Sequence, residues 1–289
     1  MYIENSYSLL HKVDAQNPVL ADAQAVIQQW HGKRIRRIDR YIQLCVAGGL
    51  ACTGKRQLPP NTGVYMSTRC GAVSTSAKVM HTIEAEHELP KPLHFVNTLG
   101  NSAGFYLTQL LQLTGTALVL SKEKLSFEAA LLHAMMDIKA GLSDCALVGA
   151  FDEVALPIAD HLNRLDAAPD APALFEGSHW LLIGKNATDS AISAPAYAKS
   201  ISDLLPTTAT SAPKIQLSFM PTDVERQQLE DYPFEVFCRE ELEAGTVPHG
   251  AFSGASIAEA RHHPTPCLHI SRGHSGHYCA IILNDAKAS

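Results

Sequence analysis

Residues 116–154, TALVLSKEKLSFEAALLHAMMDIKAGLSDCALVGAFDEV, decide the fold of this chain. A short apolar run around Val119 comes first, ahead of the charged SKEK, and predicts a buried strand. Apolar residues then recur at helical spacing over 126–139, and Gly141 is typical of a residue that ends a helix. A second apolar run at 144–151 predicts another buried strand, so the segment indicates a βαβ unit with parallel strands.

Strands and helices continue on both sides of this unit. The predicted elements are a strand and a helix within 1–30, a strand at 62–67, helices at 74–84 and 101–113, strands at 176–185, 214–220, 234–238, 267–271 and 278–284, and helices at 224–229 and 253–261. Pro, Ala, Asp, Ser and Thr dominate 166–172 and 190–211, which predict loops, the second around one short helix. We expect one compact α/β unit with two weakly repeated halves, 1–165 and 166–289.

Composition narrows the class of protein. The chain has 289 residues, of which 46% are apolar and 18% charged, which is enough for a large globular core. The net charge of −6 argues against nucleic acid as a partner. Because no apolar run approaches ~18 residues, we expect no membrane span.

Cysteine and histidine patterns point to no metal site. The seven cysteines lie mostly within apolar runs, with no CxxC pair and no secretory segment, so we expect reduced thiols and a cytoplasmic location. The histidines include His262, His263, His274 and His277, but neither HExxH nor a Cys/His ligand spacing occurs. We therefore expect no metal and no other cofactor.

Six segments, in order, resemble the β-ketoacyl synthases of the thiolase fold. They are RRIDRYIQLCVAGGLAC at 36–52, the strand and glycine turn at 63–71, FVNTLGNSAG at 95–104, SFEAALLHAMMDIKAGLSDCALVGAFDEV at 126–154, EGSHWLLIGK at 176–185 and HISRGHSGHYCAIIL at 269–283. The first resembles a basic-to-amphipathic helix of that family. The resemblance implies duplicated βαβ halves in a layered α/β/α/β/α arrangement, with a shortened C-terminal half.

The same resemblance locates the family's catalytic positions in this sequence. The family presents a cysteine at the N-terminus of the helix in the central unit, where the helix dipole activates the thiol. Counting back from the second strand without gaps puts Lys124 there, and a protonated lysine is a weak nucleophile.

The two histidine motifs are altered as well. LSFMPTDVE at 217–225 resembles the first motif, with Phe219 or Met220 in place of histidine, and GAFSGAS at 250–256 resembles the second, with Ala251 there. A local gap would place His249 at that second position instead. The family's gating phenylalanine corresponds to His274.

Loss of the nucleophile and both histidines resembles the family's chain length factors. These are non-catalytic subunits that pair with an active β-ketoacyl synthase and shape its acyl tunnel, and this chain most resembles those of aryl polyene pathways. The alternative is an acyltransferase or condensing enzyme that uses Lys124, Ser121 or Ser126 as its nucleophile. A free-standing acyl-binding relic is a third option.

The resemblance also implies three contact surfaces. The first is a basic cluster made of Lys33, Arg34, Arg36, Arg37 and Arg40. It would dock an acidic acyl carrier protein, or it is simply the solvated start of a helix. Pairing with a catalytic ketosynthase subunit in a heterodimer would use the strand that contains Thr116, Leu118, Val119 and Leu120. A tunnel wall would comprise Ala72, Val73, Ser76, Val79 and Met80, although ordinary core packing equally explains Val79 and Met80.

Overall fold

The computed structural model describes residues 1–186, 188, 190–206, 213–260, 266–274 and 276–285. Its first sheet has the strand order β3-β2-β4-β5-β1. The strands are β1 (Tyr2–Asp14), β2 (Gly63–Ser67), β3 (Ala117–Leu120), β4 (Cys145–Asp152) and β5 (Ala173–Gly184). β2 pairs in parallel with both β3 and β4, whereas β5 is antiparallel to β4 and β1. The two strands predicted around the central helix are thus parallel, with β2 between them.

A second sheet continues the hydrogen-bonded ladder through β6. Its strands are β6 (Ser190–Ile192), β7 (Ala196–Ala198), β8 (Lys214–Leu217), β9 (Phe234–Val236), β10 (Cys267–Arg272) and β11 (Tyr278–Asp285). The order is β6-β11-β10-β8-β9, and β7 pairs with β11. β6 and β7 lie where the sequence predicted only loops around a short helix, because strands of three residues leave no period to detect.

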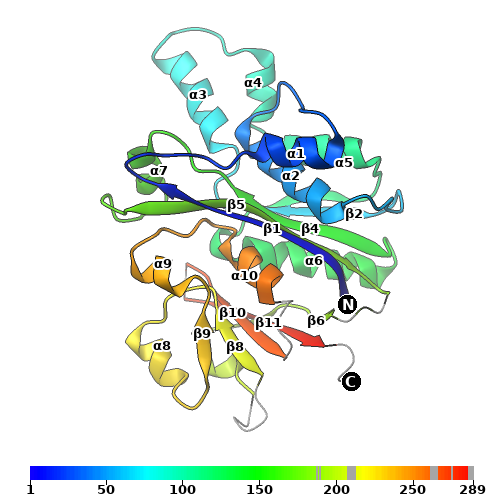
Figure 1. Ribbon diagram of the computed structural model, residues 1–289, viewed down its shortest axis with the longest axis vertical. Helices are drawn as coiled ribbons and strands as arrows, with labels where there is room; N and C mark the ends of the chain where they lie inside the picture. The colour runs from blue at the N-terminus through cyan, green and yellow to red at the C-terminus, as the bar shows by residue number, and fades with distance from the viewer. Residues whose placement is uncertain (187, 189, 207–212, 261–265, 275, 286–289) are drawn as a thin grey trace.

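Helices form layers around the two sheets (Figure 1). They are α1 (Ala23–His31), α2 (Arg40–Thr53), α3 (Val73–Glu84), α4 (Pro92–Asn97), α5 (Asn101–Leu111), α6 (Ser126–Ala140), α7 (Ile158–Arg164), α8 (Asp223–Gln228), α9 (Arg239–Glu243) and α10 (Phe252–Ala260), with 3-10 turns η1 (Glu123–Leu125) and η2 (Ser202–Leu204). α1, α2 and α5 lie on one face of the first sheet, and α6 and α10 lie between the sheets. The predicted layered α/β class is therefore confirmed.

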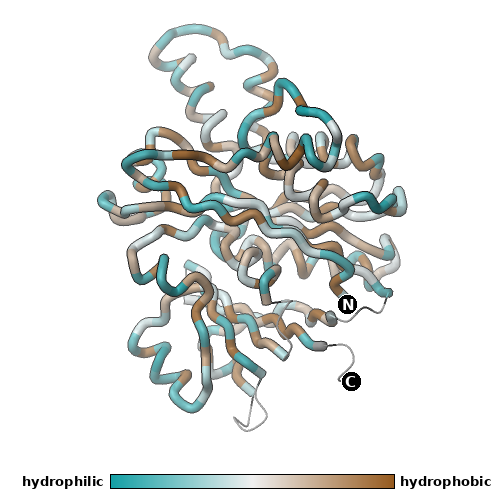
Figure 2. The backbone as a smooth tube through the Cα atoms, viewed as in Figure 1, coloured by the Kyte–Doolittle hydropathy of each residue, from teal (hydrophilic) through white to brown (hydrophobic). Residues whose placement is uncertain are grey.

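Apolar side chains fill the space between the sheets. One cluster joins Phe127 and Leu131 of α6, Ile257 of α10 and Ile281 of β11 to inward-facing residues of β4 and β5. The opposite face of the second sheet packs against Leu204 of η2 and Leu229 after α8. Figure 2 shows the hydrophobic residues concentrated in the strands and in the helices between them.

Two sequence expectations need correction. The predicted boundary between 165 and 166 separates β5 from its own sheet, because β5 lies between β4 and β1. The basic segment is not part of a helix, since residues 32–39 precede α2, which starts at Arg40. α2 is also buried almost all round rather than amphipathic. Gly48 lets it approach β5, where a Cβ would lie 2.4 Å from the indole ring of Trp180.

Candidate functional site

The connection between β3 and α6 is fixed by Ser126. This fully buried hydroxyl accepts a hydrogen bond from the N–H of Lys122 at 2.8 Å and donates to the carbonyl of Glu123 at 2.6 Å. Glu123 has a φ of 51°, a left-handed conformation that non-glycine residues adopt infrequently. The turn therefore presents Lys124 in a defined direction, and the Ser126 hydroxyl is committed to holding it.

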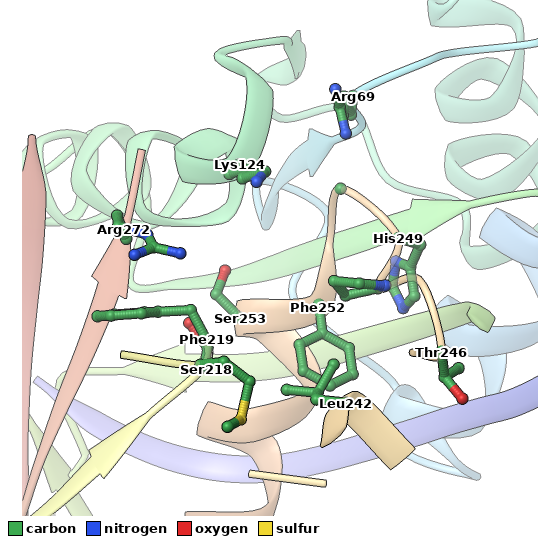
Figure 3. A pocket seen from close by; sticks show the side chains of 13 residues that line it. Arg69, Lys124, Ser218, Phe219, Leu242, Thr246, His249, Phe252, Ser253 and Arg272 are labelled. Atoms are coloured by element: carbon green, nitrogen blue, oxygen red, sulfur yellow. The ribbon is translucent and has the colours of Figure 1, made fainter. Parts of the chain in front are cut away.

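Lys124 lines a pocket of about 210 Å³ between the two halves of the chain (Figure 3). Segments far apart in sequence supply the wall: the loop after β2, η1, the loop after β8, the α9–α10 region and β10. The lining residues are Arg69, Lys124, Ser218, Phe219, Met220, Leu242, Thr246, Pro248, His249, Gly250, Phe252, Ser253 and Arg272.

Three of the residues that the family resemblance associates with catalytic positions lie together in this pocket. Lys124, Phe219 and His249 line the pocket, whereas Ala251 is fully buried in the core beside it. His274 is exposed and lines a neighbouring pocket with Glu123 and Leu125. His249 therefore faces the pocket, whereas Ala251, at the ungapped motif position, does not.

His249 has both ring nitrogens engaged. The N–H of Ala251 donates to its Nδ1 at 3.1 Å, so the proton of the neutral ring is on Nε2. That Nε2 lies 3.1 Å from Nε2 of His179, whose Nδ1 is 2.8 Å from the Ser8 hydroxyl. Burial lowers the pKa of His249 to about 3, and burial with the neighbouring ring lowers the pKa of His179. His249 consequently has no N–H left to polarise a thioester in the pocket.

Positive charge dominates the pocket lining. Enclosure by the pocket lowers the pKa of Lys124, and the charges of Arg69 and Arg272 lower it further. The Arg272 guanidinium donates to Glu225 at 2.8 Å and lies 4.5 Å from the Phe219 ring centroid. Because its pKa is lowered, the Lys124 amine loses its proton more readily than that of a solvated lysine, which makes it a better nucleophile.

Two buried carboxyl groups, Asp152 and Glu153, lie at the C-terminal end of β4, and a third, Glu128, lies in α6. Asp152 accepts hydrogen bonds from the Thr68 hydroxyl at 2.5 Å and from the N–H of Cys70 at 3.1 Å, and burial raises its pKa. Burial raises the pKa of Glu153 to about 7. Glu128 is fully buried in α6, and its pKa is raised by burial against the opposing influence of Ser271 and Ser253.

Thiol chemistry has no support at this pocket. No cysteine is among the described residues that line it. The cysteine nearest in sequence to a lining residue, Cys70, has its pKa raised to about 11, mainly by burial, so it is a thiol and not a thiolate.

The basic cluster divides into two parts. Lys33, Arg34, Arg36 and Arg37 are exposed on the loop before α2. Arg40 instead forms an ion pair with the fully buried Glu176 and donates to the carbonyl of Ala21 at 2.6 Å. Including Arg40 in a docking surface was therefore wrong, because its charge neutralises an internal carboxylate.

The proposed tunnel and interface residues lie on α3 and β3. Ala72, Val73 and Val79 are buried and Ser76 is half-buried, but Met80 is 50% exposed and does not close an internal space within this chain. β3 stands at the end of the strand order, beside β2, so it is an edge strand among the described residues, and Leu118, Val119 and Leu120 are half-buried there. Thr116, just before β3, is exposed, and its carbonyl accepts from the N–H of Val64 at 2.7 Å.

Metal and membrane sites are not indicated. Among the described residues, no group of three or more His, Cys, Asp or Glu side chains is placed to hold a metal ion. His262 and His263 lie outside the described residues. None of the helices in the described ranges is both long and apolar enough to cross a membrane.

Solved structures with the same fold include ketosynthases and a ketosynthase/chain length factor. The chain aligns over 98% of its length with 98% of the ishigamide ketosynthase/chain length factor, at 16% identity and a TM-score of 0.67. It aligns equally fully, at 13% identity and a TM-score of 0.68, with a structure of a type II polyketide synthase acyl carrier protein in complex with its ketosynthase. A β-ketoacyl synthase from Burkholderia phymatum matches 86% of this chain over 83% of its own, at 12% identity and a TM-score of 0.66.

These likenesses define the fold of the chain. It has the thiolase-like ketosynthase fold that the six sequence segments predicted. No family model and no curated protein matches the sequence. The likeness therefore lies in the three-dimensional arrangement, at identities too low to carry a function across.

Proposed function

We propose that this chain is a non-catalytic, ketosynthase-like subunit of the chain-length-factor type. It would pair with an active β-ketoacyl-ACP synthase, shape that partner's acyl tunnel and serve an aryl polyene type of fatty acid or polyketide biosynthesis. The observation that carries the proposal is the pocket at the N-terminus of α6. It has Lys124 at the nucleophile position, no cysteine among its described lining, and a histidine with both nitrogens engaged. A decarboxylating condensation needs a thiolate and free histidine donors.

The surface around β3 supports a partner role. β3 is an apolar edge strand, which soluble proteins usually protect or pair. Large apolar side chains are exposed on α3, α4, α5 and the α4–α5 connection; α5 contacts β3, and α4 contacts α5. These side chains are Met80, Ile83, Phe95, Val96, Leu99 and Phe105. Exposed apolar groups of this number favour a protein partner.

Co-expression with an active ketosynthase tests the proposal. We expect a stable complex with one copy of each chain, condensation by that complex with an acyl carrier protein, and no condensation by this chain alone. Condensation by the isolated chain would contradict the proposal.

The tunnel role has its own test within that complex. Ser76→Phe should shorten the product, measured by mass spectrometry, because a half-buried position on α3 cannot take a ring without displacing neighbouring volume. Met80→Ala serves as the comparison, and we expect it to lengthen or broaden the product only if the exposed Met80 faces the partner. Identical products from both folded variants would remove α3 from the tunnel.

The alternative is an acyl-transfer or condensing enzyme that uses an unusual nucleophile. Lys124 is the residue that favours it, because its pKa is lowered and it faces the pocket. Ser126 is unsuitable, since its buried hydroxyl already donates to Glu123. Ser121 is exposed, with its hydroxyl 3.4 Å from the carbonyl of Arg69. Acyl transfer to the isolated chain that disappears in Lys124→Gln would establish this alternative.

A further inference from the structure

Three cationic side chains line the pocket, and no acidic side chain does among the residues that the structure describes. They are Arg69, Lys124 and Arg272, which come from three different segments of the chain. Burial lowers the pKa of Lys124, and repulsion from the like charges of Arg69 and Arg272 lowers it further. The pocket therefore favours an anion electrostatically.

The carboxyl groups near the pocket do not remove this excess of positive charge. Glu225 neutralises Arg272, but it also accepts from the Tyr278 hydroxyl at 2.6 Å and from the N–H of Thr222 at 2.7 Å, which hold it outside the lining. Glu128 is fully buried in α6 and is not among the lining residues, and burial raises its pKa. Glu123, next to Lys124 in the chain, partly offsets its charge but is not among the lining residues, so no carboxylate of the described pocket wall matches Lys124.

Two buried hydroxyls also lack partners in the pocket. Ser253 and Thr246 each have 3% of their surface exposed, and neither hydroxyl oxygen has a hydrogen-bond partner among the described residues. Ser253 is near enough to Glu128 to influence its pKa but forms no hydrogen bond of normal geometry with it. In Figure 3 the Ser253 hydroxyl points toward the space between Lys124 and Arg272. Buried hydroxyls without partners are uncommon, and a ligand oxygen at this place would satisfy Ser253.

The rest of the lining is apolar. Phe219, Met220, Leu242 and Phe252 form a continuous part of the wall. A cavity of ~150 Å³ is enough to hold benzene, so about 210 Å³ accommodates a ligand with a short hydrocarbon body. A bare inorganic anion would leave this apolar surface unused.

We propose that the pocket binds a small organic carboxylate. Its carboxylate group would lie among Lys124, Arg272 and Ser253, and its hydrocarbon part would contact Phe219, Met220 and Phe252. Binding is non-covalent and involves no bond making or breaking. The inference is independent of the proposed function, because it concerns the pocket of this chain whether or not the chain pairs with a ketosynthase.

Calorimetric titration with hexanoate tests the proposal, on the chain purified alone or in complex with its partner. Hexan-1-ol is the neutral analogue, and we expect it to bind at least about tenfold more weakly because it cannot form charge-assisted hydrogen bonds. Added salt should weaken the binding of hexanoate.

Two variants and one control locate the site. Lys124→Gln and Ser253→Ala should each weaken hexanoate binding by about tenfold. The control is Lys122→Gln, on the same turn but outside this pocket, and it should leave the affinity unchanged. Lys124 is exposed, so its variant decides the matter even if Ser253→Ala does not fold.

Several results would overturn the proposal. They are an absence of hexanoate binding, equal affinity for hexan-1-ol, or unchanged affinity in Lys124→Gln. Competition by inorganic phosphate as strong as that of hexanoate would also overturn it, because the apolar wall would then play no part. None of these results bears on formation of the heterodimer, so the two proposals fail separately.

Discussion

The first sheet contains strands of 13 and 12 residues, β1 and β5, whereas β8 and β9 of the second sheet have four and three. All 12 residues of β5 are buried, because helices cover both faces of the first sheet. The second sheet has helices on the face toward the first sheet, whereas in the described residues the cluster on its far side is completed by η2, the short helices α8 and α9, and loops. We infer that the N-terminal half provides most of the stability, while the C-terminal half contributes much of the pocket wall.

The largest effect we expect is on stability, from Trp180→Ala in β5. Trp180 is fully buried, stacks on Phe151 with ring centroids 5.9 Å apart, and fills the space left by Gly48 and Gly149. Its removal should lower the free energy of unfolding by about 3–5 kcal/mol, measured by urea denaturation.

The matched variant for Trp180→Ala lies in the second sheet. Phe234 is half-buried in the edge strand β9, so Phe234→Ala should cost about 1 kcal/mol. Equal losses in the two variants would contradict the inferred difference between the sheets.

Glu153→Gln should stabilise the protein at high pH. Glu153 is 2% exposed and follows β4; one carboxyl oxygen accepts from the N–H of Ser74 at 2.8 Å and the other has no partner among the described residues. Burial raises its pKa to about 7, so the folded state binds this proton more tightly than the unfolded state. The stability contributed by the proton is complete below about pH 4 and is lost as the pH rises through 7.

The glutamine variant removes that loss without removing the acceptor for Ser74. We expect it to be more stable than the wild type by about 2–3 kcal/mol at pH 8, with the difference disappearing near pH 4. Urea denaturation at a series of pH values measures this. Glu84→Gln, at an exposed site at the end of α3, is the control and should follow the wild type at every pH. A pH-independent difference for Glu153→Gln would show that its ionisation is not the cause.

The two open edges of the sheets offer a test of the interface. The N–H of Val64 donates to Thr116 and that of Thr68 to Leu120, so alternate residues of β3 face β2 and Val119 directs its N–H to the open edge. Val119→Pro therefore removes a donor for a partner strand without breaking the β2–β3 ladder. We expect it to dissociate the heterodimer, measured by co-purification.

Val236→Pro provides the control at the other edge. Phe237 donates to Leu217 at 2.9 Å, so Val236 also faces outward, from β9. That edge is short and carries Glu235, which pairs with Lys214 at 2.6 Å, a typical protection against strand pairing. Full co-purification of the Val119→Pro variant with its partner would remove β3 from the interface.

Periodic segments were predictable from the sequence, and contacts distant in the chain were not. The helix expected at 126–139 is α6, Ser126–Ala140, because a long apolar period and a terminal glycine define it locally. In the sequence Arg40 could not be distinguished from the four cationic residues before it. Its partner Glu176 lies 136 residues further along the chain, in β5. The partner of His249, His179 in β5, is also far away in sequence, at 70 residues. The cationic pocket was missed for the same reason, because Arg69 and Arg272 have no local signal linking them to Lys124.

The smallest effect we expect concerns the loop before α2, where the structure divides the basic cluster. Arg36 and Arg37 are exposed, whereas the Arg40 side chain is 17% exposed and paired internally. The double variant Arg36→Glu/Arg37→Glu should weaken association with an acidic acyl carrier protein by about tenfold at low salt. The loss should be smaller at high salt, because salt screens the long-range attraction between exposed charges. Stability should change by no more than about 0.5 kcal/mol. Lys185→Glu, an exposed charge reversal at the end of β5, is the control for net charge. Surface plasmon resonance at several salt concentrations measures the affinity of the double variant and of the control for the carrier protein. An equal loss of affinity in the control would mean that overall charge, and not this loop, attracts the carrier protein.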